Sequence, residues 1–137
     1  MSLIETYSTT KEGYHPFLIR EGWQVAQLNY IESQHINNID KIEVHHKTDE
    51  VFVLLKGKAV LITVTRTDGV LRFSTEVMKP HITYNIPKNV WHNIAMAKGS
   101  QVLIVEQSNT HLNDVDYIKL NTGQQQELKT KLENDLK

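Results

Sequence analysis

The sequence contains no cysteine and no block of basic residues. The absence of cysteine excludes disulfides, zinc–thiolate sites and cysteine nucleophiles, and it suits a reducing compartment. With 15 basic and 16 acidic side chains, the formal net charge is -1. Because no basic patch could attract a phosphate backbone, we expect no nucleic-acid partner.

Long hydrophobic runs are also missing. The longest apolar run, residues 51–55, is far too short to span a bilayer. The first 15 residues lack the basic stretch and apolar core of a signal peptide. We therefore expect a soluble cytoplasmic protein with no membrane partner. A chain of 137 residues fits one domain and can bury roughly two thirds of its unfolded surface, so folding needs no disulfide or structural metal.

Short β-like runs separated by turn residues make up most of the chain, a pattern typical of a sandwich or barrel. Asp68-Gly69 lies between two such runs, and both residues tolerate the positive φ of a tight hairpin turn. Nine strands are predicted, at residues 17–20, 23–31, 39–46, 51–56, 58–66, 70–78, 82–86, 91–97 and 101–107.

Two stretches differ from this pattern. Residues 32–38 are polar and are predicted to form a loop or a wide hairpin connection. Residues 124–136 are rich in Gln, Glu, Lys and Leu, and Leu128, Leu132 and Leu136 recur at helical spacing. Thr122 or Asn121 could cap this helix. We expect it to pack on the barrel or on a partner chain, and a frayed amphipathic tail is the alternative.

A cluster of potential ligands follows the third predicted strand. Side chains two residues apart on a strand share a face, so Glu43 and His45 project together and His46 projects the other way. After a short turn, a hairpin of this kind can return the carboxylate of Glu50 beside His45. Surface or structural roles are expected for three other histidines, namely His15, His35 and His111.

A second cluster contains Trp91 and His92, after a turn at residues 87–89. Only a closed sheet could bring His92 to His45 and Glu50. Two imidazoles and one carboxylate would leave open coordination positions, a set that suits Fe(II) and also accepts Mn, Ni, Zn or Co. Glu43 could be a fourth ligand or a general base. Alternatively, His45 and Glu50 are only a surface pair, and His92 belongs to the core.

The spacing of these residues resembles the two motifs of the cupin superfamily. His45, Glu50 and Gly57 match the first motif, with four and then six residues between them. Pro87, Asn89 and His92 match the second, with Asn in place of Gly. The motifs run from residue 43 to 92, and the strand pattern extends the likeness from about residue 15 to 108. The chain looks like small single-domain bacterial cupins that have no defined reaction.

This resemblance implies an all-β fold, a double-stranded β-helix or cupin jelly-roll barrel, with a short C-terminal helix. One domain would cover residues 1–137, with the barrel at about 15–108 and an extension and helix at about 109–137. The likeness also implies that His45, Glu50 and His92 bind a divalent metal such as Fe, Mn, Ni or Zn. Two residues depart from the family pattern, because Glu43 replaces a histidine and Met96 a frequent asparagine. A metal-free pocket is therefore the alternative.

Three functions fit this sequence. The first is a metal-dependent isomerase, epimerase or dioxygenase that acts on a small polar molecule, such as a sugar or a carboxylate, with Glu43 as a catalytic residue. The second is a non-catalytic binder or sensor of a small ligand, and the third is a structural module. A homodimer is expected, since cupin barrels of this size often pair. The candidate substrate-binding residues are Phe52, His81, Tyr84 and Trp91.

Overall fold

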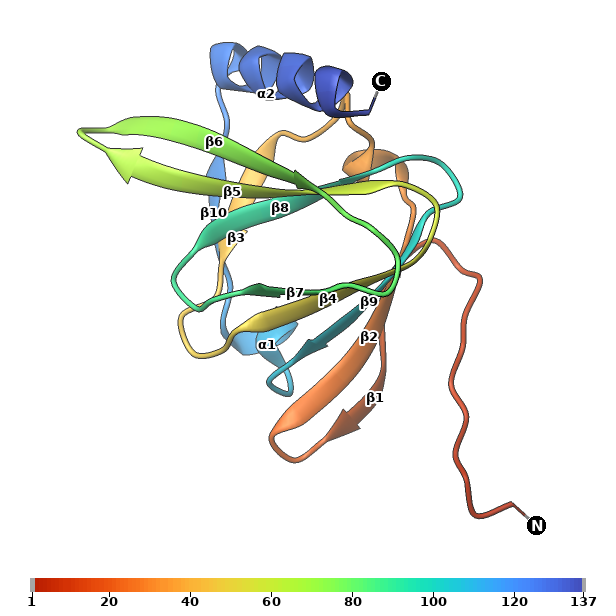
Figure 1. Cartoon of the computed structure of the whole chain (residues 1–137). Coiled ribbons are helices and arrows are strands. Elements are labelled where there is room, and N and C mark those ends of the chain that lie inside the picture. Colours follow the sequence, from red (N-terminus) through yellow and green to blue (C-terminus); the bar gives the residue numbers. More distant parts are fainter. Residues whose placement is uncertain (1, 137) are drawn as a thin grey trace.

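The computed structural model describes residues 2–136, which form ten strands in two antiparallel sheets. The first sheet, sheet A, contains β1 (Gly13–Arg20), β2 (Trp23–Asn29), β9 (Gln101–Glu106), β4 (Glu50–Lys56) and β7 (Thr83–Ile86) in that spatial order. The second, sheet B, contains β10 (Asp116–Lys119), β3 (Lys41–Val44), β8 (Trp91–Met96), β5 (Ala59–Thr67) and β6 (Val70–Val77). The sheets face each other as a jelly-roll barrel (Figure 1), which confirms the predicted fold class.

Three helical segments complete the described chain. The 3₁₀ turn η1 (Glu32–Gln34) lies in the polar connection between β2 and β3, and α1 (Thr110–Asn113) follows β9. The C-terminal helix α2 (Thr122–Asp135) begins at Asn121 with a capping box, in which the side chains of Asn121 and Gln124 each accept the other's backbone N–H. The predicted cap and helix are therefore confirmed, and the helix packs on the barrel.

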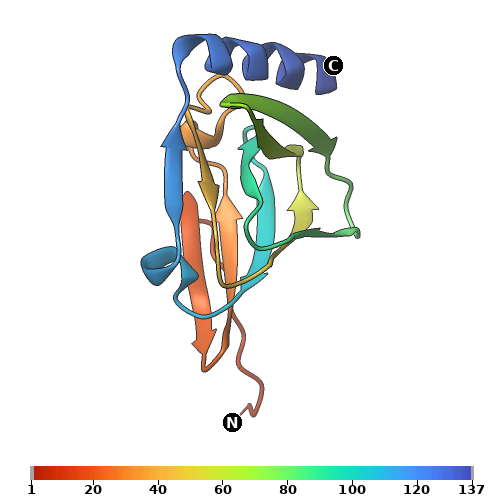
Figure 2. The same ribbon diagram turned by 90° about the vertical axis from the view of Figure 1, so that its left-hand side faces the viewer.

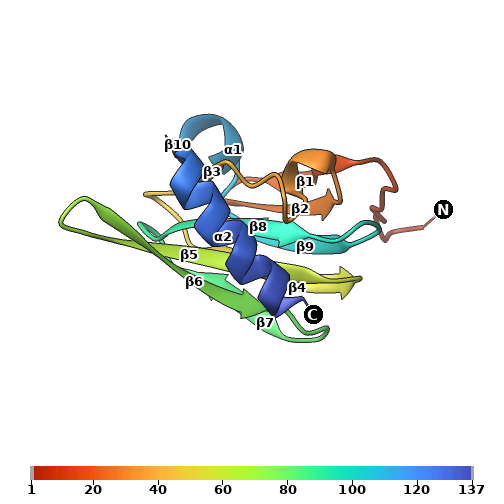
Figure 3. The same cartoon turned by 90° about the horizontal axis from the view of Figure 1, so that it is seen from above.

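The central strands of sheet B, β5 and β8, are largely buried on both faces. The inner face of the sheet meets sheet A across a core that includes Leu61, Ile94 and Met96. Part of its outer face is covered by α2 (Figure 3). Leu128 and Leu132 of α2 are fully buried there. Strands buried on both faces read as continuous apolar runs rather than as alternating ones, and residues 59–62 show this pattern. Figure 2 shows α2 and the N-terminal segment at opposite ends of the molecule.

Two positive-φ residues stand at the positions where the two cupin motifs have glycine. Gly57 follows β4 with φ +86°, and a Cβ there would lie 2.7 Å from Cα of Ser100, so the turn requires glycine. Asn89, which stands where the cupin motif has glycine, also adopts a positive φ, of 69°. The Asp68-Gly69 hairpin likewise has positive φ at both residues, as predicted. In residues 2–136, no helix has the length and apolar character needed to cross a membrane.

The strand register brings residues of five strands to one end of the barrel. Glu43 on β3 pairs with His92 on β8, and Glu50 on β4 pairs with Glu106 on β9. Gln24 on β2 also pairs with Glu106. Since directly paired residues in a sheet point to the same face, these polar side chains all enter the barrel at the same level.

Candidate metal centre

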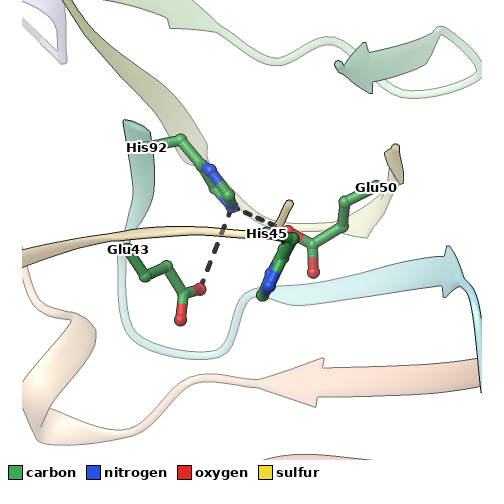
Figure 4. Close-up of side chains that lie close together, drawn as sticks. All are labelled: Glu43, His45, Glu50 and His92. Atoms are coloured by element: carbon green, nitrogen blue, oxygen red, sulfur yellow. Dashed lines mark hydrogen bonds and ion pairs between the residues drawn. The ribbon is translucent and has the colours of Figure 1, made fainter. Parts of the chain in front are cut away.

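The side chains of Glu43, His45, Glu50 and His92 converge inside the barrel (Figure 4). One ligand atom from each lies within 4.8 Å of the others. Glu43 projects from β3, His45 follows the end of that strand, Glu50 opens β4 and His92 is the second residue of β8. The centroids of the two imidazole rings are 5.4 Å apart. The structure thus brings together both of the clusters found in the sequence.

Backbone carbonyls fix the tautomer of both imidazoles. His45 Nδ1 lies 2.7 Å from the carbonyl oxygen of Asp114, and His92 Nδ1 lies 2.9 Å from that of Val90. A carbonyl only accepts hydrogen bonds, so both Nδ1 atoms carry a proton. Both Nε2 atoms then face the same carboxylate oxygen, Oε1 of Glu50, at 2.8 Å for His92 and 3.4 Å for His45. Three acceptors meet without a donor, so the centre needs a cation.

Without a metal, protons fill that role. Burial alone would raise the pKa of Glu50, but the adjacent imidazoles of His45 and His92 outweigh it and lower the pKa to about 2. Burial alone would lower the pKa of His45, yet the Glu50 carboxylate 3.4 Å from its Nε2 raises it to about 9. The pKa of His92 is also raised, because its bond to Glu50 again outweighs burial. For Glu43, burial and then the charge of Glu50 raise the pKa.

A third buried acid, Glu106, adjoins this cluster. Its Oε1 accepts hydrogen bonds from the hydroxyl of Tyr14 at 2.6 Å and from the amide of Gln24 at 3.1 Å. Burial and then the charge of Glu50 raise the pKa of Glu106 to about 8. Burial and the charge of Glu106 also raise the pKa of Tyr14, so the phenol stays protonated and donates to the carboxylate. Our sequence reasoning missed Glu106. The alternation of Val102, Ile104 and Glu106 along one face of β9 was the available signal.

Asp114 holds the segment that carries His45. Its carboxylate accepts the backbone N–H groups of His46 and Lys47, at 2.9 and 2.8 Å, while its own carbonyl accepts the Nδ1 proton of His45. One residue therefore orients the imidazole and clamps the turn that follows it. Such supporting hydrogen bonds keep a ligating ring in one tautomer and one orientation.

His46 faces away from the cluster, as the parity of the strand predicts. Its ring is exposed and contacts the side chains of Asn89 and Asp116, both at 2.9 Å. These contacts tie together the turn after β3, the turn before β8 and the edge strand β10.

The cluster lies in a cavity of about 250 Å³. Apolar side chains from both sheets and several polar groups line it. Six of them are Leu28, Phe52, Ile104, Lys41, Tyr117 and His111. The ammonium group of Lys41 stacks over the ring of Tyr117, 4.5 Å from its centroid. The cavity therefore combines an apolar wall, one cationic side chain and the acid–imidazole cluster, as small-ligand sites commonly do.

The structure brings one of the four predicted substrate-binding residues to this cavity. Phe52 lines it, with its ring centroid 6.3 Å from that of His92. Trp91 points to the other face of sheet B, where it packs on the core beneath α2, because neighbouring strand residues alternate. Tyr84 packs against the barrel core, and its hydroxyl accepts the backbone N–H of Lys79. His81 is exposed on a turn with φ 70°.

Comparison with known proteins identifies the fold. No family model and no curated protein matches the sequence. Among solved structures, a mutant 3,4-ketoisomerase from Thermoanaerobacterium thermosaccharolyticum in complex with TDP-4-keto-6-deoxyglucose has 20% identity and a TM-score of 0.52, over 85% of this chain and 77% of that one.

Two further structures agree. A 3,4-ketoisomerase from Helicobacter canadensis has 15% identity and a TM-score of 0.52, over 76% of this chain and 73% of that chain. A cupin protein from Bacteroides fragilis has 16% identity and a TM-score of 0.50, over 82% and 91%. The chain has the cupin fold.

The residues present fit a divalent metal ion. His45 Nε2 is buried and has no hydrogen-bond partner, which is an arrangement that a bound cation would relieve. Contacts between the atoms that would coordinate the ion range from 2.8 Å, between His92 Nε2 and Glu50 Oε1, to 3.9 Å, between His92 Nε2 and Glu43 Oε1. Ligands about 2.1 Å from one ion lie roughly 3 to 4 Å from each other, so these separations suit a shared ion.

Proposed function

We propose that this chain binds one divalent metal ion through His45, Glu50 and His92, with Glu43 beside it, and that it binds and acts on a small polar molecule in the same cavity. The observation that supports this proposal is the meeting of two imidazole nitrogens and a carboxylate oxygen, all acceptors, at one buried point. A bound metal would polarise a carbonyl or hydroxyl oxygen of the ligand.

The protein's own groups define the chemistry around that oxygen. The Glu43 side chain is 30% exposed and lies 3.9 Å from His92 Nε2, at the side of the cluster open to the cavity. We propose that Glu43 takes a proton from the ligand, and its raised pKa, which lies closer to neutral pH, supports this role as a general base. Proton transfer next to a carbonyl, as in isomerisation or epimerisation, is the reaction that this arrangement supports best.

A sugar or a small hydroxy- or keto-carboxylate is the ligand class we propose. The cavity is small, and its walls offer the ammonium group of Lys41 and the hydroxyl of Tyr117 to oxygen atoms. The likeness in fold to two 3,4-ketoisomerases supports keto sugars as the first compounds to test.

A metal-free binder is the second candidate, and one distance favours it. The 2.8 Å contact between His92 Nε2 and Glu50 Oε1 is also the length of a charge-assisted hydrogen bond from a protonated imidazole. In that case protons on the imidazoles, and no metal ion, would balance the charge of Glu50, and the cavity would bind a polar ligand without a metal.

Metal analysis separates the two candidates. The purified protein would be stripped with a chelator, loaded in turn with Mn²⁺, Fe²⁺, Ni²⁺ or Zn²⁺, desalted and measured for bound metal. We expect about one ion per chain for at least one of these metals. The variant His92→Gln, which keeps much of the side-chain volume, should lose that ion. His81→Asn is the matched control, because residue 81 lies outside the cavity and Asn tolerates its positive φ.

Wild-type protein that retains no metal would favour the metal-free candidate. Retention in His92→Gln equal to that of the wild type would remove His92 from the ligand set. Thermal shifts with a panel of keto sugars, aldoses and hydroxy acids would then test the ligand class, since a ligand of the folded state raises Tm.

The homodimer, the cytoplasmic location and the single-domain organisation stay predictions. Light scattering at micromolar concentration would test the first of these, and a monomeric mass would contradict it.

A further inference from the structure

We propose that Glu106 is an additional ligand of the metal ion, so that this centre contains three carboxylates and two imidazoles, and that Glu106 raises the affinity for Mn²⁺ more than the affinity for Zn²⁺. This inference rests on the proposed function, because it needs a metal at His45, Glu50 and His92. It assigns a role to a buried acid that belongs to neither sequence motif.

The two oxygens of Glu106 have different surroundings. Oε1 accepts two hydrogen bonds, from Tyr14 and Gln24, and these fix the plane of the carboxylate. Oε2 is buried, has no hydrogen-bond partner, and lies 3.9 Å from Nε2 of His45, which is itself without a partner. The side chain is only 2% exposed, so bulk water does not donate a hydrogen bond to Oε2. Two orphaned acceptors that face each other are what a shared cation would join.

The position of Glu106 in the sheet supports the same assignment. It is the direct partner of Glu50 on the neighbouring strand, so both carboxylates enter the barrel side by side. A purely structural acid would need only Oε1, because Tyr14 and Gln24 both donate to that atom. The second oxygen of such an acid would more commonly find a donor of its own.

The larger gain expected for Mn²⁺ follows from the donor types. Carboxylate oxygens suit hard ions such as Mn²⁺, whereas sites rich in imidazole suit Zn²⁺, Cu²⁺ and Ni²⁺. Glu43 belongs to the convergent group of four, and Glu106 adjoins that group at His45, so both would add oxygen to a centre that has only two nitrogen ligands. Each carboxylate also adds a negative charge that a divalent ion can balance.

Titration of the metal-free, full-length protein with Mn²⁺ tests this role. Binding would be followed by the loss of the electron paramagnetic resonance signal of free Mn²⁺, and competition with Zn²⁺ would give the preference between the two ions. Glu106→Gln keeps an oxygen for Tyr14 and Gln24 and replaces Oε2 by an amide. We expect this variant to bind Mn²⁺ at least about tenfold more weakly. Its Zn²⁺ affinity should fall by a smaller factor.

Glu76→Gln is the matched control, since it makes the same change at an exposed acid of β6 that does not line this cavity. We expect its Mn²⁺ affinity to stay within about threefold of the wild type. If Glu106→Gln does not fold, as judged by its thermal melt, Glu106→Asp keeps the charge but withdraws the carboxylate by one methylene, and it should also weaken Mn²⁺ binding.

Two outcomes distinguish a failure of the proposed function from a failure of this inference alone. If the wild type binds neither ion, the proposed metal site fails and the inference fails with it. If the wild type binds Mn²⁺ and Glu106→Gln binds it equally well, only the role of Glu106 is overturned. An unchanged preference between Mn²⁺ and Zn²⁺ in a variant with weaker binding would overturn the argument from donor type.

Discussion

The two ends of the barrel interior are built from the same strands but from opposite kinds of residue. At one end, the inward positions of β2, β4, β8 and β9 are polar. They are Gln24, Glu50, His92 and Glu106. Farther along the same faces, the inward positions are apolar. They include Ala26, Phe52, Leu54, Ile94, Met96, Val102 and Ile104. All these side chains are buried, so burial alone does not distinguish the ends.

The difference shows how one small barrel separates stability from chemistry. The apolar end stabilises the fold, because burying a large aliphatic or aromatic side chain contributes about 1.5 to 3 kcal/mol. The polar end gathers three acids and two imidazoles, and a buried charge without a partner destabilises a fold. A site of this kind persists because the other end of each strand holds the register.

The largest effect is expected at the apolar end. Leu54→Ala should lower the free energy of unfolding by about 3 kcal/mol, and Tm by roughly 10 °C, because it leaves a cavity in a core where Leu54 is 3% exposed. Metal affinity should stay within about twofold of the wild type, since the two ends are well separated along the strand. Denaturant melts and metal titrations would measure both. A large loss of affinity would show that the ends are coupled.

The stability of the metal-free protein should depend on pH, mainly through the ionisable residues of the polar end. The folded-state pKa of His45 is about 9, above the ordinary 6.5, so its stabilising charge is present below pH 6.5 and is lost as the pH rises through 9. Glu106 has a pKa of about 8 instead of 4.5, so the folded state retains a proton that the unfolded chain releases, and stability also falls between pH 4.5 and 8.

Both shifts lower stability as the pH rises, so Tm of the metal-free protein should fall by about 5 °C from pH 6 to pH 9. At the acid side, the lowered pKa of Glu50 means that its contribution is present above pH 4.5 and is lost toward pH 2. Saturating metal should reverse the trend at alkaline pH, because the ion takes the place of the protons. A Tm that rises steadily from pH 6 to pH 9 without metal would contradict this account.

The smallest effect is expected at Asp114, which supports the segment that carries His45. Asp114→Asn keeps a carbonyl oxygen for only one of the two backbone N–H groups that Asp114 now accepts, so the segment that orients His45 should loosen. We expect metal affinity to fall by about tenfold with little change in Tm. Asp116→Asn is the control, because Asp116 is exposed and contacts only the outward-facing His46 among the residues of this turn. Equal affinities for the two variants would argue against the clamp.

The sequence predicted much of the fold from local signals. Nine of the ten strands were predicted, with shifted ends, because turn residues such as Asp68-Gly69 divide them clearly. Edge strand β10 was missed, since its four residues are exposed or half exposed and show no apolar alternation. The helix α1 has a single buried residue, Thr110, and so gives no periodic pattern either.

The sequence by itself determined the strand pattern, the capped terminal helix and the pairing of Glu43 with His45 on one face, because each depends on residues close together in the chain. Only the tertiary structure decided that Glu106 and Tyr14 join the site and that Trp91 does not. It also decided that the carbonyl of Asp114 orients His45. These contacts join residues that are far apart in sequence, and they exist only because two sheets close into a barrel with one register.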